Sequence, residues 1–234
     1  MFSRTITSVP GWERLAAGSG IGFVLASALA FLIVPDPPTA DEGSEFILNF
    51  VAVNDSDLLW QAFFFGLGGV LLLWFGGTLA AALRRLGRNP DDRLPAVITA
   101  STGAAVAMFL VGVICVGALA SGIEQMDQGV AYGLYQVGSF AFVMTDFPAA
   151  AFVWAASIGI ARSDLLPKSV GYVGGIVGLL LVVNAGGRLL GDRADFAPGG
   201  TANTIVFAFF LFWVFVTSLF LMQRVSPARR TPES

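Results

Sequence analysis

Histidine is absent from this 234-residue chain, and cysteine occurs only once, at Cys115. The absence of histidine excludes histidine-ligated haem, the usual zinc and copper sites, and Ser-His or Cys-His catalysis. A single cysteine excludes a disulfide within the chain. We therefore expect no catalytic residues, no metal site and no cofactor, and an enzyme is the class of function with the least support.

Charged residues are also scarce, at 12% of the chain against about 25% in a typical soluble domain. Hydrophobic residues make up 56%, and they fall in long blocks rather than at the periods of a soluble helix or strand. The polar residues are too few to coat a water-soluble globule of this size. No segments alternate apolar and polar residues as membrane β-strands do, so the sequence predicts an all-α integral membrane protein.

Six apolar segments are long enough to cross a bilayer, which requires roughly 20 residues of helix. They lie at about 15–34, 58–83, 94–120, 131–160, 170–190 and 204–222. The first exceeds the apolar region of a secretory signal, so we expect it to remain as a helix. The connections after the second span are short. We therefore expect one transmembrane domain over residues 1–234, with consecutive helices as antiparallel neighbours in a compact bundle.

The basic residues predict how this bundle is oriented. If the N-terminus is cytoplasmic, eleven of the thirteen arginines and lysines lie inside, and Arg188 and Arg193 lie outside. Basic residues concentrate on the cytoplasmic side of membrane proteins, so we expect both termini in the cytoplasm. The eleven are Arg4, Arg14, Arg84, Arg85, Arg88, Arg93, Arg162, Lys168, Arg224, Arg229 and Arg230.

The connection at 35–57 is the longest, and it carries six acidic residues and no basic one. Ser44 could cap a short helix there, with one apolar face formed by Phe46, Ile47, Phe50 and Val51. Such a helix would lie in the outer interface or cover the mouth of the bundle. An irregular loop is the alternative.

Asp146 lies near the middle of the fourth span, where a carboxylate is costly and is therefore a candidate for function. Pro148 follows it, and a proline within a helix leaves the carbonyl four residues earlier, at Met144, without its usual donor. The sequence predicts a kink with a carboxyl group beside that carbonyl. This pair could bind a proton, a cation or a polar ligand group, and a purely structural hydrogen bond is the alternative.

Four further polar residues could line a cleft that opens to the outside. Asn184 and Arg188 are four residues apart in the fifth span and share one helical face. Gln136 and Tyr132 lie in the outer half of the fourth span. Arg188 differs in depth from Asp146 by roughly 15 Å at 1.5 Å per residue. We therefore expect Asp146 to be protonated or hydrogen-bonded to hydroxyls, amides or water rather than paired with Arg188.

Glycines are concentrated on one part of the fifth span. Gly171, Gly174, Gly175 and Gly178 form two overlapping Gly-x-x-x-Gly patterns. Small residues at this spacing allow another helix to approach closely in lipid. The pattern predicts packing within the bundle, with homodimerisation through the same face as the alternative.

Three short stretches carry a family resemblance. Gly-Trp-Glu-Arg-Leu-Ala-Ala-Gly-Ser-Gly at 11–20 leads into the first span, Phe-Pro-Ala-Ala at 147–150 lies in the fourth, and Leu-Leu-Pro-Lys-Ser-Val-Gly-Tyr-Val-Gly at 165–174 enters the fifth. Together they resemble the six-helix membrane proteins, common in actinobacteria, that are known only as domains of unknown function. The resemblance implies a bacterial plasma-membrane protein and supplies no activity or site residues. It also implies an uncharged residue at position 146.

Two functions remain open at this point. The first is transport or binding of a small molecule or ion within the bundle, with proton coupling through Asp146. The second is a non-catalytic accessory or scaffold subunit of a larger membrane complex. The expected partners are the lipid bilayer and either a second copy of the chain or other membrane subunits. We expect no nucleic-acid partner.

Overall fold

The computed structural model describes residues 10–34, 37–38, 42–86, 93–191 and 194–225. These residues form α-helices, two short 3-10 turns and connecting segments, with no strand among them. The helices are α1 (Pro10–Ile33), α2 (Ser44–Val53), α3 (Asp55–Leu86), α4 (Leu94–Gly122), α5 (Gln128–Met144), α6 (Asp146–Arg162), α7 (Lys168–Gly191) and α8 (Thr201–Val225), and the turns are η1 (Ile123–Gln125) and η2 (Ala194–Phe196).

The six predicted spans are confirmed. Five of them are the helices α1, α3, α4, α7 and α8, and the fourth span is formed by α5 and α6 in succession, over Gln128–Arg162. Each has the length and the apolar composition needed to cross a membrane. The chain is therefore a multi-pass membrane protein.

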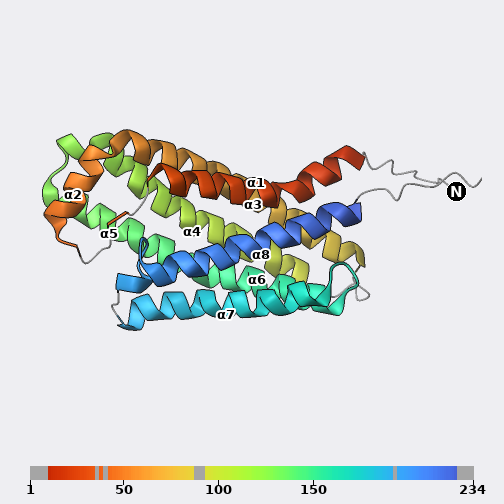
Figure 1. The fold of residues 1–234 in the computed structure, drawn as a ribbon. Helices are drawn as coiled ribbons and strands as arrows, with labels where there is room; N and C mark the ends of the chain where they lie inside the picture. Colours follow the sequence, from red (N-terminus) through yellow and green to blue (C-terminus); the bar gives the residue numbers. More distant parts are fainter. Residues whose placement is uncertain (1–9, 35–36, 39–41, 87–92, 192–193, 226–234) are drawn as a thin grey trace, which may run out of the picture.

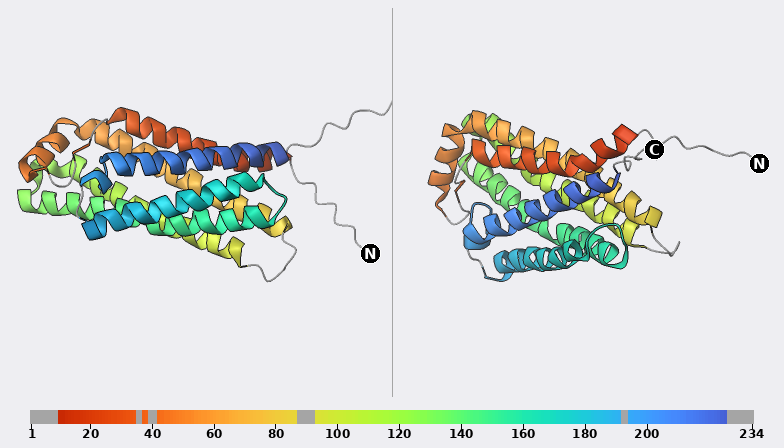
Figure 2. Two further views of the ribbon diagram at one scale, coloured as in Figure 1. Left: turned by 60° about the horizontal axis from the view of Figure 1, so that its bottom comes forward. Right: turned by 45° about the vertical axis from the view of Figure 1, so that its right-hand side comes forward.

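The spans form a closed ring in the order of the sequence. Each packs against the spans before and after it, and α8 packs against α1 to close the ring. Figures 1 and 2 show that α1 begins and α8 ends at the same end of the bundle, where α3 also ends and α6 is joined to α7. We call this the terminal end, and we call the opposite end, where α2 and η2 lie, the α2 end.

The short helix predicted in the longest connection is α2, but its register differs from the expectation. Gly43 is the N-cap residue and Ser44 is already helical, so Ser44 does not cap this helix. Ile47 and Val51 are buried, whereas Phe46 is 57% exposed and does not belong to the buried face. Because α2 packs against the α2 ends of α3, α4 and α5, the neighbouring helices decide which of its apolar residues are buried.

Large aromatic side chains fill the bundle toward the terminal end. Phe75, Phe152 and Trp213 are almost completely buried and meet edge to face, with ring centroids 6.4 and 5.8 Å apart. The Trp213 Nε1–H donates to the Val170 carbonyl at 3.0 Å, so this buried indole is satisfied. Empty space in the ring is found instead toward the α2 end.

Candidate functional site

A cavity of about 160 Å³ lies inside the ring in the half toward the α2 end. Every one of the six spans contributes to its wall, as does α2. The connecting segments contribute Pro37, Pro38, Pro198 and Gly199 at the α2 end. Gly199 has a φ of +85°, and a side chain there would collide with the Pro37 carbonyl. Glycine at position 199 therefore allows the segment before α8 to approach Pro37 closely at the α2 end of the cavity.

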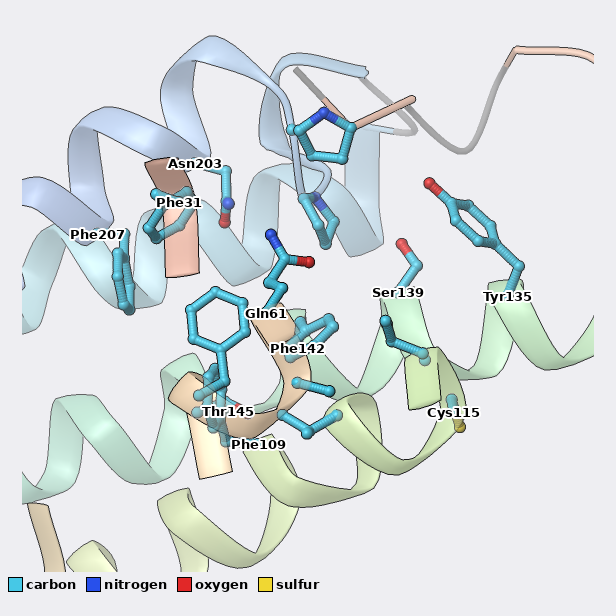
Figure 3. Close-up of a pocket in the computed structure, with 18 of the residues that line it drawn as sticks. Phe31, Gln61, Phe109, Cys115, Tyr135, Ser139, Phe142, Thr145, Asn203 and Phe207 are labelled. Carbon is cyan, nitrogen blue, oxygen red and sulfur yellow. The ribbon is translucent and has the colours of Figure 1, made fainter. Parts of the chain in front are cut away.

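The wall of the cavity is mainly aromatic. Figure 3 shows several of its phenylalanine rings around one space, with Gln61 reaching in among them. Phe109 meets both Phe65 and Phe142 edge to face, with ring centroids 5.3 Å apart in each pair. Seven phenylalanines line the cavity, at Phe31, Phe50, Phe65, Phe109, Phe142, Phe207 and Phe210.

Three polar side chains from consecutive spans meet in the cavity wall. The Asn184 Nδ2 group of α7 donates to Asp146 Oδ2 of α6 at 2.7 Å and to Asn203 Oδ1 of α8 at 2.9 Å. Asn184 is only 1% exposed, and its Oδ1 is buried without a hydrogen-bond partner. We call Asp146, Asn184 and Asn203 the polar cluster. The expectation that an amide would bond to Asp146 agrees with this geometry.

The sequence explains why Asp146 is found at a break in the fourth span. Thr145 separates α5 from α6, and Pro148 is the third residue of α6. Because Pro148 has no N–H, it cannot donate to the Met144 carbonyl as the helix would require. The hydroxyl of Thr145 turns back to the Ala141 carbonyl at 2.9 Å. The hydrogen-bond ladder is thus interrupted where the carboxyl group meets the cavity.

The other polar residues expected in a common cleft are separated by the structure. Arg188 is buried one turn beyond Asn184, with its guanidinium carbon 5.6 Å from the centre of the Phe140 ring, and it does not line the cavity. Gln136 donates to the Tyr132 hydroxyl at 2.8 Å, and neither residue lines the cavity. Of the four, only Asn184 belongs to the cavity wall, because the rotation of α5 presents Tyr135, Ser139 and Phe142 to it instead.

The glycines of α7 take different positions around the helix. A side chain at Gly171 or Gly174 would collide with α6, and one at Gly178 would collide with the Trp154 indole. A side chain at Gly175 would meet open space, although its carbonyl accepts from Trp154 Nε1 at 3.1 Å. Three of the four glycines therefore lie where α7 packs within this bundle, and the face they form is occupied.

Sequence reasoning did not select Asn203, Gln61 or Tyr135 as site residues. Gln61 lies within an apolar span, where a polar side chain is costly, so the sequence alone was sufficient to mark it as a candidate. Asn203 lies immediately before the predicted sixth span, so its depth gave no such signal. Tyr135 donates its hydroxyl to the Pro38 carbonyl, a contact between distant segments that spacing along one helix could not reveal.

The chemistry available in the cavity is that of one carboxyl group among amides, hydroxyls and rings. Among the described residues that line it, Asp146 is the only carboxylate, and none is a lysine or arginine. The described part of the chain contains no group of three potential metal ligands.

In comparisons with models of protein families, with curated proteins and with solved structures, no match to this chain was found.

Proposed function

We propose that this membrane protein binds a small, mainly apolar molecule inside its helical ring. The cavity beside the polar cluster is the observation that carries this proposal. Ligand sites are typically apolar hollows with a few polar groups that orient the ligand. An engineered apolar cavity of about 150 Å³ in another protein binds benzene, so a volume of about 160 Å³ suits a ligand with a body of roughly that size.

The position of Asp146 is the reason to include transport in the proposal. It lies near the centre of the span Gln128–Arg162, and ionisable groups at such depth often belong to ligand or proton pathways. Asp146 is bonded to a neighbouring helix, as a structural role would require, and it also lines the cavity, as a binding role would require. In the transport form of the proposal, Asp146 exchanges a proton as the ligand enters and leaves.

The distribution of basic residues supports a location of the terminal end in the cytoplasm. The resemblance of the three short stretches to actinobacterial membrane proteins supports a bacterial plasma membrane. Arg188, the described basic residue nearest the α2 end, is buried. On this proposal the cavity lies in the outer half of the membrane. Five of the thirteen basic residues lie outside the described residues, namely Arg4, Arg88, Arg193, Arg229 and Arg230. The described basic residues of the terminal end are Arg14, Arg84, Arg85, Arg93, Arg162, Lys168 and Arg224.

Blocking the cavity tests the binding proposal. Ala62 lines the cavity and is partly buried, whereas Ala28 is exposed on the outer surface of α1. We expect purified protein in lipid nanodiscs to bind toluene, Ala62→Leu to lose at least tenfold in affinity, and the matched control Ala28→Leu to bind normally. Binding would be measured by ligand-detected NMR. Equal binding by both variants, at unchanged unfolding temperatures, would contradict the proposal.

A groove on the outer surface favours the accessory-subunit function as a second candidate. It has a volume of about 480 Å³ and lies between α1 and α3, with Trp12 and Trp74 beside the small residues Ala16 and Gly77. Small residues allow a foreign helix to approach closely in lipid. Purification in a stoichiometric complex with other membrane subunits, lost in Gly77→Leu, would support this function.

A further inference from the structure

We propose that the ligand of the cavity is a small protonated amine with an apolar body, whose ammonium group donates to Asp146. This inference deepens the proposed function and rests on it. It depends on three features of the cavity: its single charged group, the direction of its hydrogen bonds, and the nature of its wall.

The carboxyl group has room for a further donor. Asn184 donates to Oδ2 of Asp146, and no described residue donates to Oδ1. No lysine or arginine is among the described residues of the cavity wall. Arg188, the nearest cation along α7, lies over the Phe140 ring and outside the cavity wall. A carboxylate in an apolar surrounding needs a compensating cation or a proton, and a ligand ammonium supplies the cation.

The neighbouring polar groups mostly present acceptors. Gln61 Nε2 donates to the Ala30 carbonyl at 3.1 Å, which leaves its Oε1 as an acceptor. The hydroxyl protons of Thr145 and Tyr135 are likewise given to backbone carbonyls. The amide of Gln61 keeps one N–H beside its free Oε1, whereas each of the two hydroxyls has given its only proton to the protein and can now only accept. A ligand rich in donors is therefore matched better than one rich in acceptors.

The polar cluster shows the same excess of free acceptors over free donors. Both hydrogen bonds of Asn184 use its Nδ2 group, and its buried Oδ1 has no donor. Asn203 Oδ1 is engaged with Asn184, so the amide nitrogen of Asn203 is the donor that the cluster retains. A buried acceptor without a partner is unfavourable, so the cluster is short of donors rather than of acceptors.

The phenylalanine wall favours a cation as well. Aromatic rings attract ammonium groups through the negative potential of their faces, and aromatic cages recognise organic cations in this way. Seven phenylalanines line the cavity together with Tyr135. A bare metal ion would find a single carboxylate in the described cavity wall and would leave most of the cavity empty. An amine with a ring-sized body uses the carboxylate, the acceptors and the rings at once.

Ligands of one size and different charge test this inference. We expect wild-type protein in nanodiscs at pH 7 to bind benzylamine at least tenfold more tightly than toluene, and benzoate more weakly than either. Ala62→Leu, in which the cavity is blocked, provides the background for partitioning into lipid. In Asp146→Asn the preference for benzylamine over toluene should be lost, because the neutral amide cannot pair with the ammonium group.

The outcomes separate the two proposals. If toluene and benzylamine bind equally to the wild-type cavity, or if the preference survives in Asp146→Asn, the amine inference is wrong while the cavity remains a binding site. If no ligand of the series binds above the Ala62→Leu background, both proposals fail. Should Asp146→Asn not fold, the ranking of the three ligands on the wild-type protein still decides.

Discussion

Asn184 joins three consecutive spans through a single amide group. It holds Asp146 of α6 and Asn203 of α8 from its place on α7, and it is almost completely buried. A hydrogen bond to a charged group is worth about 1.5–3 kcal/mol and one between neutral groups about 0.5–1.5 kcal/mol, whereas replacing both partners by apolar groups can be nearly neutral. The energetic role of Asp146 in the fold is therefore tied to Asn184.

Substitutions at these two positions should be strongly non-additive. We expect Asn184→Leu to destabilise the protein by about 2 kcal/mol, because it leaves the Asp146 carboxyl group without its donor. The double variant Asp146→Leu/Asn184→Leu should cost less than the sum of the single variants, with a coupling energy of about 1–2 kcal/mol. Equilibrium unfolding in mixed micelles measures all three, and additive costs would show that the bond contributes nothing.

At the scale of elements, the packing of α7 depends on which side of the helix each glycine occupies. Gly174 faces Ser157 of α6 and Trp213 of α8, so any side chain there would collide with both. Gly175 is its neighbour in sequence and faces open space. The same chemical change at adjacent positions thus has opposite structural consequences.

We expect Gly174→Ala to destabilise the protein by about 1–3 kcal/mol, as overpacking in a filled interior does. Gly175→Ala is the matched control, and it should be neutral or stabilising by up to about 1 kcal/mol, because alanine favours a helix more than glycine does. Unfolding temperatures of the two purified variants provide the comparison. Equal destabilisation by both would show that the loss comes from the backbone of α7 rather than from contacts at Gly174.

The sequence predicts the elements well because each span is a separate apolar block of sufficient length. It also selects Asp146 and Asn184 individually, since polar residues are costly at their depth. Their contact could not be predicted, because it depends on how α6 and α7 are rotated against each other. The rotation of α5, which turns Tyr132 and Gln136 away from the cavity wall, could not be predicted either. Asn203 and Tyr135 enter the site through contacts between distant segments, which no local pattern records.

At the scale of the whole molecule, the ring has two different halves. Aromatic side chains fill the half toward the terminal end, whereas the half toward the α2 end contains the cavity. An ion pair between Arg85 and Glu13, with a distance of 2.8 Å, joins α1 and α3 near the terminal end. Since Arg85 is largely exposed, this pair contributes little to stability. If the cavity binds a ligand as proposed, the orientation of the molecule decides on which side of the membrane that ligand enters.

Accessibility of introduced cysteines should report this orientation. Ser56 is exposed at the α2 end and Ser169 is exposed at the terminal end. In a Cys115→Ala background, we expect a membrane-impermeant maleimide to label Ser56→Cys in intact cells and Ser169→Cys only after the membrane is opened. The expected result follows from the excess of basic residues at the terminal end. Labelling of Ser169→Cys alone in intact cells would invert the proposed topology.

A structure of the protein with benzylamine bound tests the central claim most directly. The account predicts the ligand ring among Phe65, Phe109 and Phe142, with its nitrogen within hydrogen-bond distance of Asp146. It also predicts that the Asn184–Asp146 bond persists beside the ligand. A cavity that remains empty or holds only lipid at saturating ligand, or a ligand found only on the outer surface of the ring, would contradict the account.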